Sequence, residues 1–158
     1  MSDSPATTTL HATCVEAGGA AIVLTGASGA GKSDLALRLL HAEGPRKFRL
    51  VADDSLPLER RNNQLVALAP RRHAGLIEVR GLGLVRVPFT AEALVKLVVS
   101  LRPWASIERY PGDTLRRTNI LGLSVPTTDI DPQSASAVAR VMLALDVVND
   151  PRRLFSDD

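Results

Sequence analysis

The sequence predicts a single α/β domain. Short apolar runs typical of buried strands alternate with turn residues, leucines recur at helical spacing after residue 32, and a glycine-rich segment separates that helix from the strand before it. The length of 158 residues agrees with one domain. A chain of this size buries roughly 70% of the surface of its unfolded form, so its folding does not require disulfides or a structural metal.

The N-terminal half predicts one helix among several strands. Residues 33–42 are the helix, because the leucines lie on one face and Gly44-Pro45 ends the pattern. A hairpin turn is expected at Gly18-Gly19 and another at Arg61-Asn62-Asn63. The expected strands are residues 8–16, 20–25, 48–52, 56–59 and 64–68.

The C-terminal half predicts further strands and a second helix. Residues 132–148 are the helix: Asp131 is a capping residue, Pro132 fits a first turn, and Pro151 prevents continuation. Its apolar face carries Val138, Val141, Met142 and Leu145. The expected strands are residues 76–80, 84–87 and 94–101, with short strands and turns between residues 103 and 126. We expect an N-terminal tail at residues 1–7, a domain at 8–150 and a C-terminal tail at 151–158.

Composition excludes several classes of function. Aromatic residues make up 3% of the chain, too few for a base-stacking surface, and a net charge of +2 does not indicate a nucleic-acid partner. Cys14 is the only cysteine, which excludes an internal disulfide and a cysteine-cluster metal site. The first residues lack the basic and apolar regions typical of a signal peptide, so we expect no export signal. The longest uncharged run, residues 17–31, is too short to span a bilayer. We expect a cytoplasmic protein without a membrane partner.

The strongest motif is the segment from residue 26 to residue 33, which we call the phosphate loop. It matches G-x-x-x-x-G-K-[ST] in full, between an apolar strand and a helix. Its expected nucleotide-binding residues are Gly26, Ala27, Ser28, Gly29, Ala30, Gly31, Lys32 and Ser33. In such a loop backbone amides surround an oligophosphate, the lysine reaches its outer phosphates, and the serine hydroxyl binds Mg²⁺. The alternative is a glycine-rich turn without a ligand, and the strand–loop–helix order favours ATP and Mg²⁺.

Asp53 and Asp54 are the next candidates, at the carboxyl end of the following strand, where α/β sheets bind ligands. One carboxylate is suited to hold Mg²⁺ and the other to accept a proton, although Asp-Asp-Ser is also common in turns. His11, Glu78 and Arg109 are weak candidates for site residues when each is considered alone. A lone histidine is more often structural, and Arg109 beside Glu108 also fits a surface ion pair.

Four segments together resemble the catalytic domain of the HPr kinase/phosphorylase family, bacterial enzymes that phosphorylate a serine of the phosphocarrier protein HPr. The segments are Leu10-His11-Ala12, the phosphate loop, Leu50-Val51-Ala52-Asp53-Asp54 and Glu78-Val79-Arg80-Gly81-Leu82-Gly83. They occur in the family's order, and the last is the most specific. The similarity covers about residues 8–110 of this chain.

The resemblance implies a phosphate-loop fold of the type shared with phosphoenolpyruvate carboxykinase, a mixed sheet with flanking helices. It also implies roles. His11 matches the family's active-site histidine, Lys32 the loop lysine, and Asp54, with its neighbour Asp53, the carboxylate that takes the seryl proton. The remaining matches are Ser33 and Glu78 at Mg²⁺-associated positions and Arg109 at an active-site arginine.

Two departures from the family pattern qualify the expected function. Only ten residues precede His11, so the sequence resembles short forms without the separate N-terminal domain. After Val125-Pro126 the chain has Thr127-Thr128-Asp129-Ile130 in place of the family's P-V-K-x-G-R-N, which predicts weak or absent phosphorylase activity. We expect a homo-oligomer, since family members form hexamers.

The sequence alone is compatible with three functions. The first is an ATP- and Mg²⁺-dependent serine kinase for an HPr-like carrier. The second is a phosphate-loop kinase of a small metabolite, and the third is a non-catalytic module that senses a nucleotide.

Overall fold

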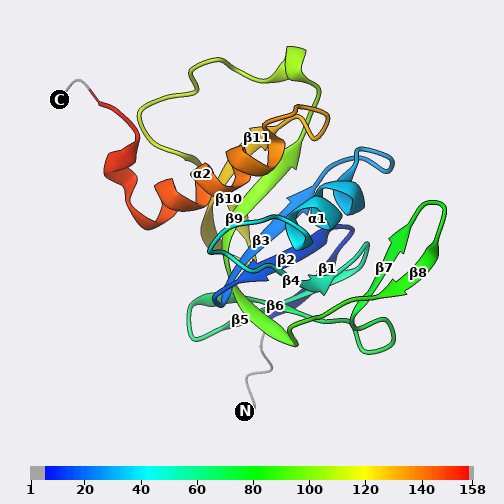
Figure 1. Ribbon diagram of the computed structural model, residues 1–158. Helices are drawn as coiled ribbons and strands as arrows, with labels where there is room; N and C mark the ends of the chain where they lie inside the picture. Colours follow the sequence, from blue (N-terminus) through cyan, green and yellow to red (C-terminus); the bar gives the residue numbers. More distant parts are fainter. Residues whose placement is uncertain (1–5, 157–158) are drawn as a thin grey trace.

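The computed structural model describes residues 6–156, in which a curled sheet carries both helices on one face (Figure 1). The strands are β1 (Thr7–Leu10), β2 (Thr13–Ala17), β3 (Ala20–Thr25), β4 (Arg49–Ala52), β5 (Leu56–Arg61), β6 (Gln64–Leu68), β7 (Leu76–Val79), β8 (Gly83–Arg86), β9 (Glu92–Leu101), β10 (Arg116–Ile120) and β11 (Leu123–Ile130). The helices are α1 (Lys32–Leu40) and α2 (Ala137–Asn149), with 3₁₀ turns η1 (Trp104–Ser106) and η2 (Pro151–Arg153).

The main sheet is mixed, as expected. Its strand order is β1-β5-β6-β9-β3-β2-β4, and the β10–β11 hairpin joins it through β11 and β9. The pairs β3–β9 and β9–β11 are parallel, and the other pairs are antiparallel. Strands β7 and β8 form a separate hairpin that stands out from the main sheet (Figure 1).

Side-chain alternation along the buried strands divides the core in two. On β3, Ile22 and Leu24 face the cluster that includes Leu35 of α1 and Val141 of α2. Val23 lies in the second cluster, on the opposite face, with residues of β4, β5 and β6. Because both faces of β3 are buried, the strand is a continuous apolar run.

Most expected strands and hairpins are confirmed, but the run at residues 8–16 is not one strand. It divides into β1 and β2 with a break at residues 11 and 12. The tail expected at residues 1–7 ends earlier, because Thr7 begins β1 and the Ala6 carbonyl accepts a hydrogen bond from the Arg60 amide. The remainder of that expected tail, residues 1–5, lies outside the described residues, as do 157 and 158.

The helix expected from residue 132 begins five residues later, at Ala137. Asp131 does act as a cap, but of a turn: its carboxylate accepts hydrogen bonds from the backbone N–H of Gln133 and of Trp104. The backbone N–H of Ser134 bonds to the Asp131 carbonyl, which closes the turn before the helix starts. Over residues 6–156, neither helix has the length and apolar character required to cross a membrane.

Candidate active site

The phosphate loop connects β3 to α1, as the motif predicts. Gly26, Gly29 and Gly31 have positive φ angles of 155°, 79° and 101°, and the chain packs closely at Gly26, where an added Cβ would lie 3.1 Å from the Ala30 Cβ. Within the described residues, the backbone N–H groups of Ser28 and Gly29 have no hydrogen-bond acceptor. The loop therefore presents free amide donors at the N-terminus of α1, the arrangement that binds phosphate.

Lys32 is buried within this loop. Its side chain is 7% exposed, and its Nζ donates to the carbonyls of Gly26 at 2.8 Å and Ala27 at 3.1 Å. These bonds satisfy two of the three ammonium donors without a carboxylate, so the positive charge is not neutralised by the protein. The charge is thus available to an anion held by the loop.

The acidic doublet follows β4 and lies beside the loop. Strand β4 pairs with β2 in a register that puts Cys14 opposite Ala52, so the start of β2 meets the end of β4. One oxygen of Asp53, Oδ1, accepts from Ser33 Oγ at 2.7 Å and from Thr13 Oγ1 at 3.0 Å. This network ties the first carboxylate of the doublet to the last residue of the phosphate loop.

Asp54 points the other way. Its backbone is in the left-handed region, with a φ of 69°, which turns the chain directly after the strand. Its side chain is 71% exposed, and Oδ1 lies 3.2 Å from Nδ1 of His11, at the break between β1 and β2. Two adjacent carboxylates therefore have different surroundings: Asp53 is fixed by hydrogen bonds, and Asp54 faces solvent beside a histidine.

Glu78 completes this edge from the β7–β8 hairpin. Its backbone N–H donates to Asp53 Oδ2 at 3.0 Å, and its side chain is exposed. The Ser33 hydroxyl, the Asp53 carboxylate and the Glu78 carboxylate are hard oxygen donors. Mg²⁺ in nucleotide sites is held by one or two such groups together with phosphate oxygens, so Ser33 and Asp53, whose oxygens lie 2.7 Å apart, fit this ion. Among residues 6–156 no three acidic, histidine or cysteine side chains form a metal site by themselves, so phosphate oxygens are required to complete it.

Comparison with known proteins identifies the family of this chain. The family model described as HPr Serine kinase C-terminal domain matches residues 4–150. The chain belongs to this family. The HPr kinase/phosphorylase of Clostridium beijerinckii is 32% identical over an alignment that covers 94% of this chain and 51% of the relative. That of Clostridium tetani is 42% identical, with 78% of this chain and 41% of the relative covered.

A solved structure bears out the expected fold of the HPr kinase family. The Hpr(Ser) kinase/phosphatase from Coxiella burnetii aligns with a TM-score of 0.73 and 26% identity, covering 92% of both chains. The chain spans about half or less of the length of the curated relatives it matches. The match to the Coxiella structure supports the α/β fold with a mixed sheet and flanking helices.

Arg109 is not part of the cluster described above. It lies exposed in the long segment between η1 and β10, and it has no hydrogen bond or ion pair within residues 6–156. The chain is fixed on either side of η1 and this segment: Arg102, before η1, and Arg116, at the start of β10, both contact Asp129 Oδ2, at 3.5 and 2.6 Å. The structure therefore brings together His11, Ser33, Asp53, Asp54 and Glu78, and leaves Arg109 on a separate loop.

Sequence reasoning missed Thr13 and a cavity beside the loop. Thr13 is fully buried and contacts Asp53, but a threonine inside an apolar strand gives no local signal of such a role. The cavity has a volume of about 370 Å³ and is lined by residues 27–30, 101–103 and 131–133. Because these three segments are distant in the sequence, only the fold reveals it.

Proposed function

We propose that this chain is an ATP- and Mg²⁺-dependent kinase that phosphorylates a serine of an HPr-like carrier protein in the cytoplasm. The observation that carries the proposal is the divergence of the acidic doublet. Asp53 is hydrogen-bonded to Ser33 of the phosphate loop, and Asp54 is exposed to solvent beside His11. Names of HPr kinase/phosphorylase relatives support the carrier as substrate.

In the proposed reaction the loop amides and Lys32 bind the phosphates of ATP and orient the terminal phosphoryl group toward the doublet. Ser33 and Asp53 would hold Mg²⁺, with Glu78 at its edge, and the bound ion would offset charge on the transferring phosphoryl group. The carrier's serine oxygen forms a bond to the γ-phosphorus, the bond from that phosphorus to the β–γ bridging oxygen breaks, and ADP leaves.

Asp54 accepts the seryl proton in this reaction, and His11 orients Asp54 through their 3.2 Å contact. A carboxylate is a weak base toward an alcohol, so correct positioning of Asp54 contributes more to the rate than its basicity does. Arg109 is proposed to join the site only when its loop moves toward the carrier. Phosphorylase activity is proposed to be weak or absent.

The test is transfer of label from γ-labelled ATP with Mg²⁺ to purified HPr-like carriers of the host organism. We expect label on a carrier serine with the unmodified chain. Asp54→Asn should lower the rate by at least about a hundredfold while the Kd for ADP stays within threefold, because general-base catalysis contributes on the order of 10²–10⁴. Asp150→Asn is the matched control, since Asp150 is a carboxylate at the far end of α2.

Two outcomes would contradict the proposal. Turnover of ATP with a small alcohol, and no label on any carrier, would favour a metabolite kinase. Tight ATP binding without any transfer would favour a nucleotide sensor. Phosphorylase activity is tested by incubating the serine-phosphorylated carrier with inorganic phosphate. Release of pyrophosphate at the rate of the kinase reaction would contradict the expectation that this activity is weak or absent.

A further inference from the structure

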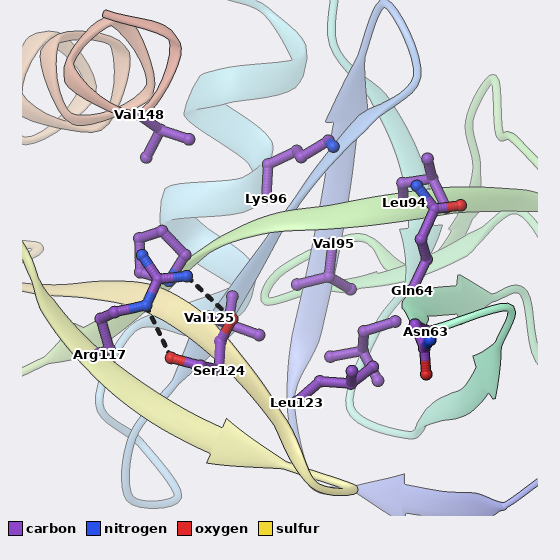
Figure 2. Close-up of a pocket in the computed structure, with 12 residues that line it drawn as sticks. Asn63, Gln64, Leu94, Val95, Lys96, Arg117, Leu123, Ser124, Val125 and Val148 are labelled. Carbon is purple, nitrogen blue, oxygen red and sulfur yellow. Dashed lines mark hydrogen bonds between the residues drawn. The ribbon is translucent and has the colours of Figure 1, made fainter. Parts of the chain in front are cut away.

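A second cavity, of about 350 Å³, shares no lining residue with the phosphate loop and lies where the sheet divides (Figure 2). One edge of β9 pairs with β6 up to Leu94 and with β11 from Val98 onward, while β3 occupies the opposite edge. Residues 95–97 therefore have no strand partner on this edge within the described part of the chain. The cavity fills the gap between the diverging strands β6 and β11.

A bulge in β9 marks the same position. Ala21 of β3 pairs with Val95, and Ile22 pairs with Leu97, so Lys96 is an extra residue in the strand. As a result Val95 and Leu97 belong to opposite core clusters, although residues two apart normally share a face. Bulges redirect a side chain, and this one leaves Lys96 exposed at the cavity.

The cavity is lined by two cations and by no acidic residue. Lys96 and Arg117 have no ion pair among the described residues, whereas the neighbouring Arg116 contacts Asp129. Arg117 is held in place by Ser124: its Nε donates to Oγ at 2.6 Å and its Nη2 to the carbonyl at 3.0 Å (Figure 2). A guanidinium fixed in this way keeps unused donors and an uncompensated charge.

The remaining lining suits a molecule with an apolar part. Val95, Leu123 and Val125 are apolar side chains of the wall, and Asn63 and Gln64 add amide groups at the β5–β6 turn (Figure 2). Small-molecule sites typically combine an apolar wall with a few fixed polar groups. The volume lies in the range of such sites.

We propose that this cavity binds a small organic anion, with its carboxylate or phosphate group on Arg117 and its apolar part against Val95 and Leu123. Lys96 supplies a second charge. Its ammonium group extends away from Arg117 in Figure 2, but its flexible stem has no bonded partner among residues 6–156, so it is free to rotate toward a bound anion.

The test is a titration of the full chain with glutarate and, separately, with glycerol 3-phosphate, followed by backbone-amide NMR. ADP and Mg²⁺ are present throughout, so that the phosphate loop is occupied and the probes do not bind there. We expect shifts centred on residues 95–97, 117 and 124. Their absence with both probes up to about 10 mM, a range that detects millimolar binding, overturns the proposal.

Variants test which groups bind the probe. Arg117→Gln should weaken binding at least about tenfold and Lys96→Met about threefold, because charged hydrogen bonds contribute more than a flexible point charge. Arg71→Gln, which removes an exposed cation elsewhere, should leave the Kd unchanged. Equal affinity in Arg117→Gln and the unmodified chain would overturn the assignment.

Ser124→Ala keeps both charges and the bond from Arg117 Nη2 to the backbone carbonyl, but it removes the bond from Nε to Oγ and so loosens the guanidinium. It therefore tests the site if Arg117→Gln does not fold. We expect about a threefold loss of affinity from the lost orientation of the guanidinium. Shifts at the same residues that grow with protein concentration, without any probe, would instead identify the cavity as an interface between copies and contradict the proposal.

Discussion

Replacing Thr13 by valine tests whether this buried hydroxyl holds the acidic doublet. Valine has nearly the same shape, so the change leaves the packing of β2 in place. It removes the hydrogen bond from Oγ1 to Asp53 and the long 3.5 Å bond that Oγ1 accepts from the Asp54 N–H. A hydrogen bond to a charged group contributes about 1.5–3 kcal/mol, and the extra apolar burial of valine returns about 0.8 kcal/mol. We therefore expect the free energy of unfolding to fall by about 1.5 kcal/mol.

The assay is urea unfolding at pH 7, followed by far-UV circular dichroism, with the slope m compared between variants. Thr8→Val is the matched control, because the Thr8 side chain lies on β1 and makes no hydrogen bond within the described residues. The rate of phosphoryl transfer should also fall about tenfold with the Kd for ADP unchanged, since only the doublet loses its position. A loss below about 0.5 kcal/mol, or equal to that of the control, would refute the reasoning.

Two further predictions concern the backbone and the buried thiol. Gly75→Ala should lower the free energy of unfolding in urea by about 2 kcal/mol, because the φ of Gly75 is 74° and an added Cβ would lie 2.7 Å from Phe89. Gly18→Ala is the control: its φ is 61° but the space around it is open, so it should lower the free energy of unfolding by about 1 kcal/mol. Equal losses for the two variants would contradict the packing argument. Burial, reinforced by the charge of Glu16, raises the pKa of the Cys14 thiol well above its usual range. The unfolded chain therefore loses the thiol proton at a lower pH than the folded chain does. As the pH rises above about 8.5, the free energy of unfolding falls by up to about 1.4 kcal/mol per pH unit. Cys14→Ala should remove this part of the alkaline slope between pH 8 and 10, and parallel slopes for both proteins would contradict it.

The sequence was sufficient for the parts of the fold and site that depend on local pattern. The phosphate loop and α1 follow from glycine spacing and leucine periodicity over adjacent residues. The tight turns at Gly18-Gly19 and Asn62-Asn63 follow in the same way, since these residues adopt positive φ angles there.

The parts that local sequence patterns do not specify depend on contacts between distant segments. The break at His11 and the pairing of β2 with β4 bring His11 to Asp54, and no periodicity encodes that register. Likewise, Asp131 and Pro132 give a valid helix-start signal, but the Asp131 carboxylate is used by Trp104 and Gln133, and the helix begins later. The cavity at Lys96 depends on where β6 and β11 leave β9, which only the tertiary structure specifies.

The central claim is that a nucleotide held by the phosphate loop puts its metal ion beside the acidic doublet. Backbone-amide NMR of the full chain with ADP and substoichiometric Mn²⁺ tests this directly, because the paramagnetic ion broadens only nearby signals. We predict loss of the signals of the phosphate loop and of Asp53, Asp54 and Glu78, while those of Lys96 and Arg117 stay sharp. Sharp signals at Asp53 and Asp54, with broadening elsewhere, would contradict the account.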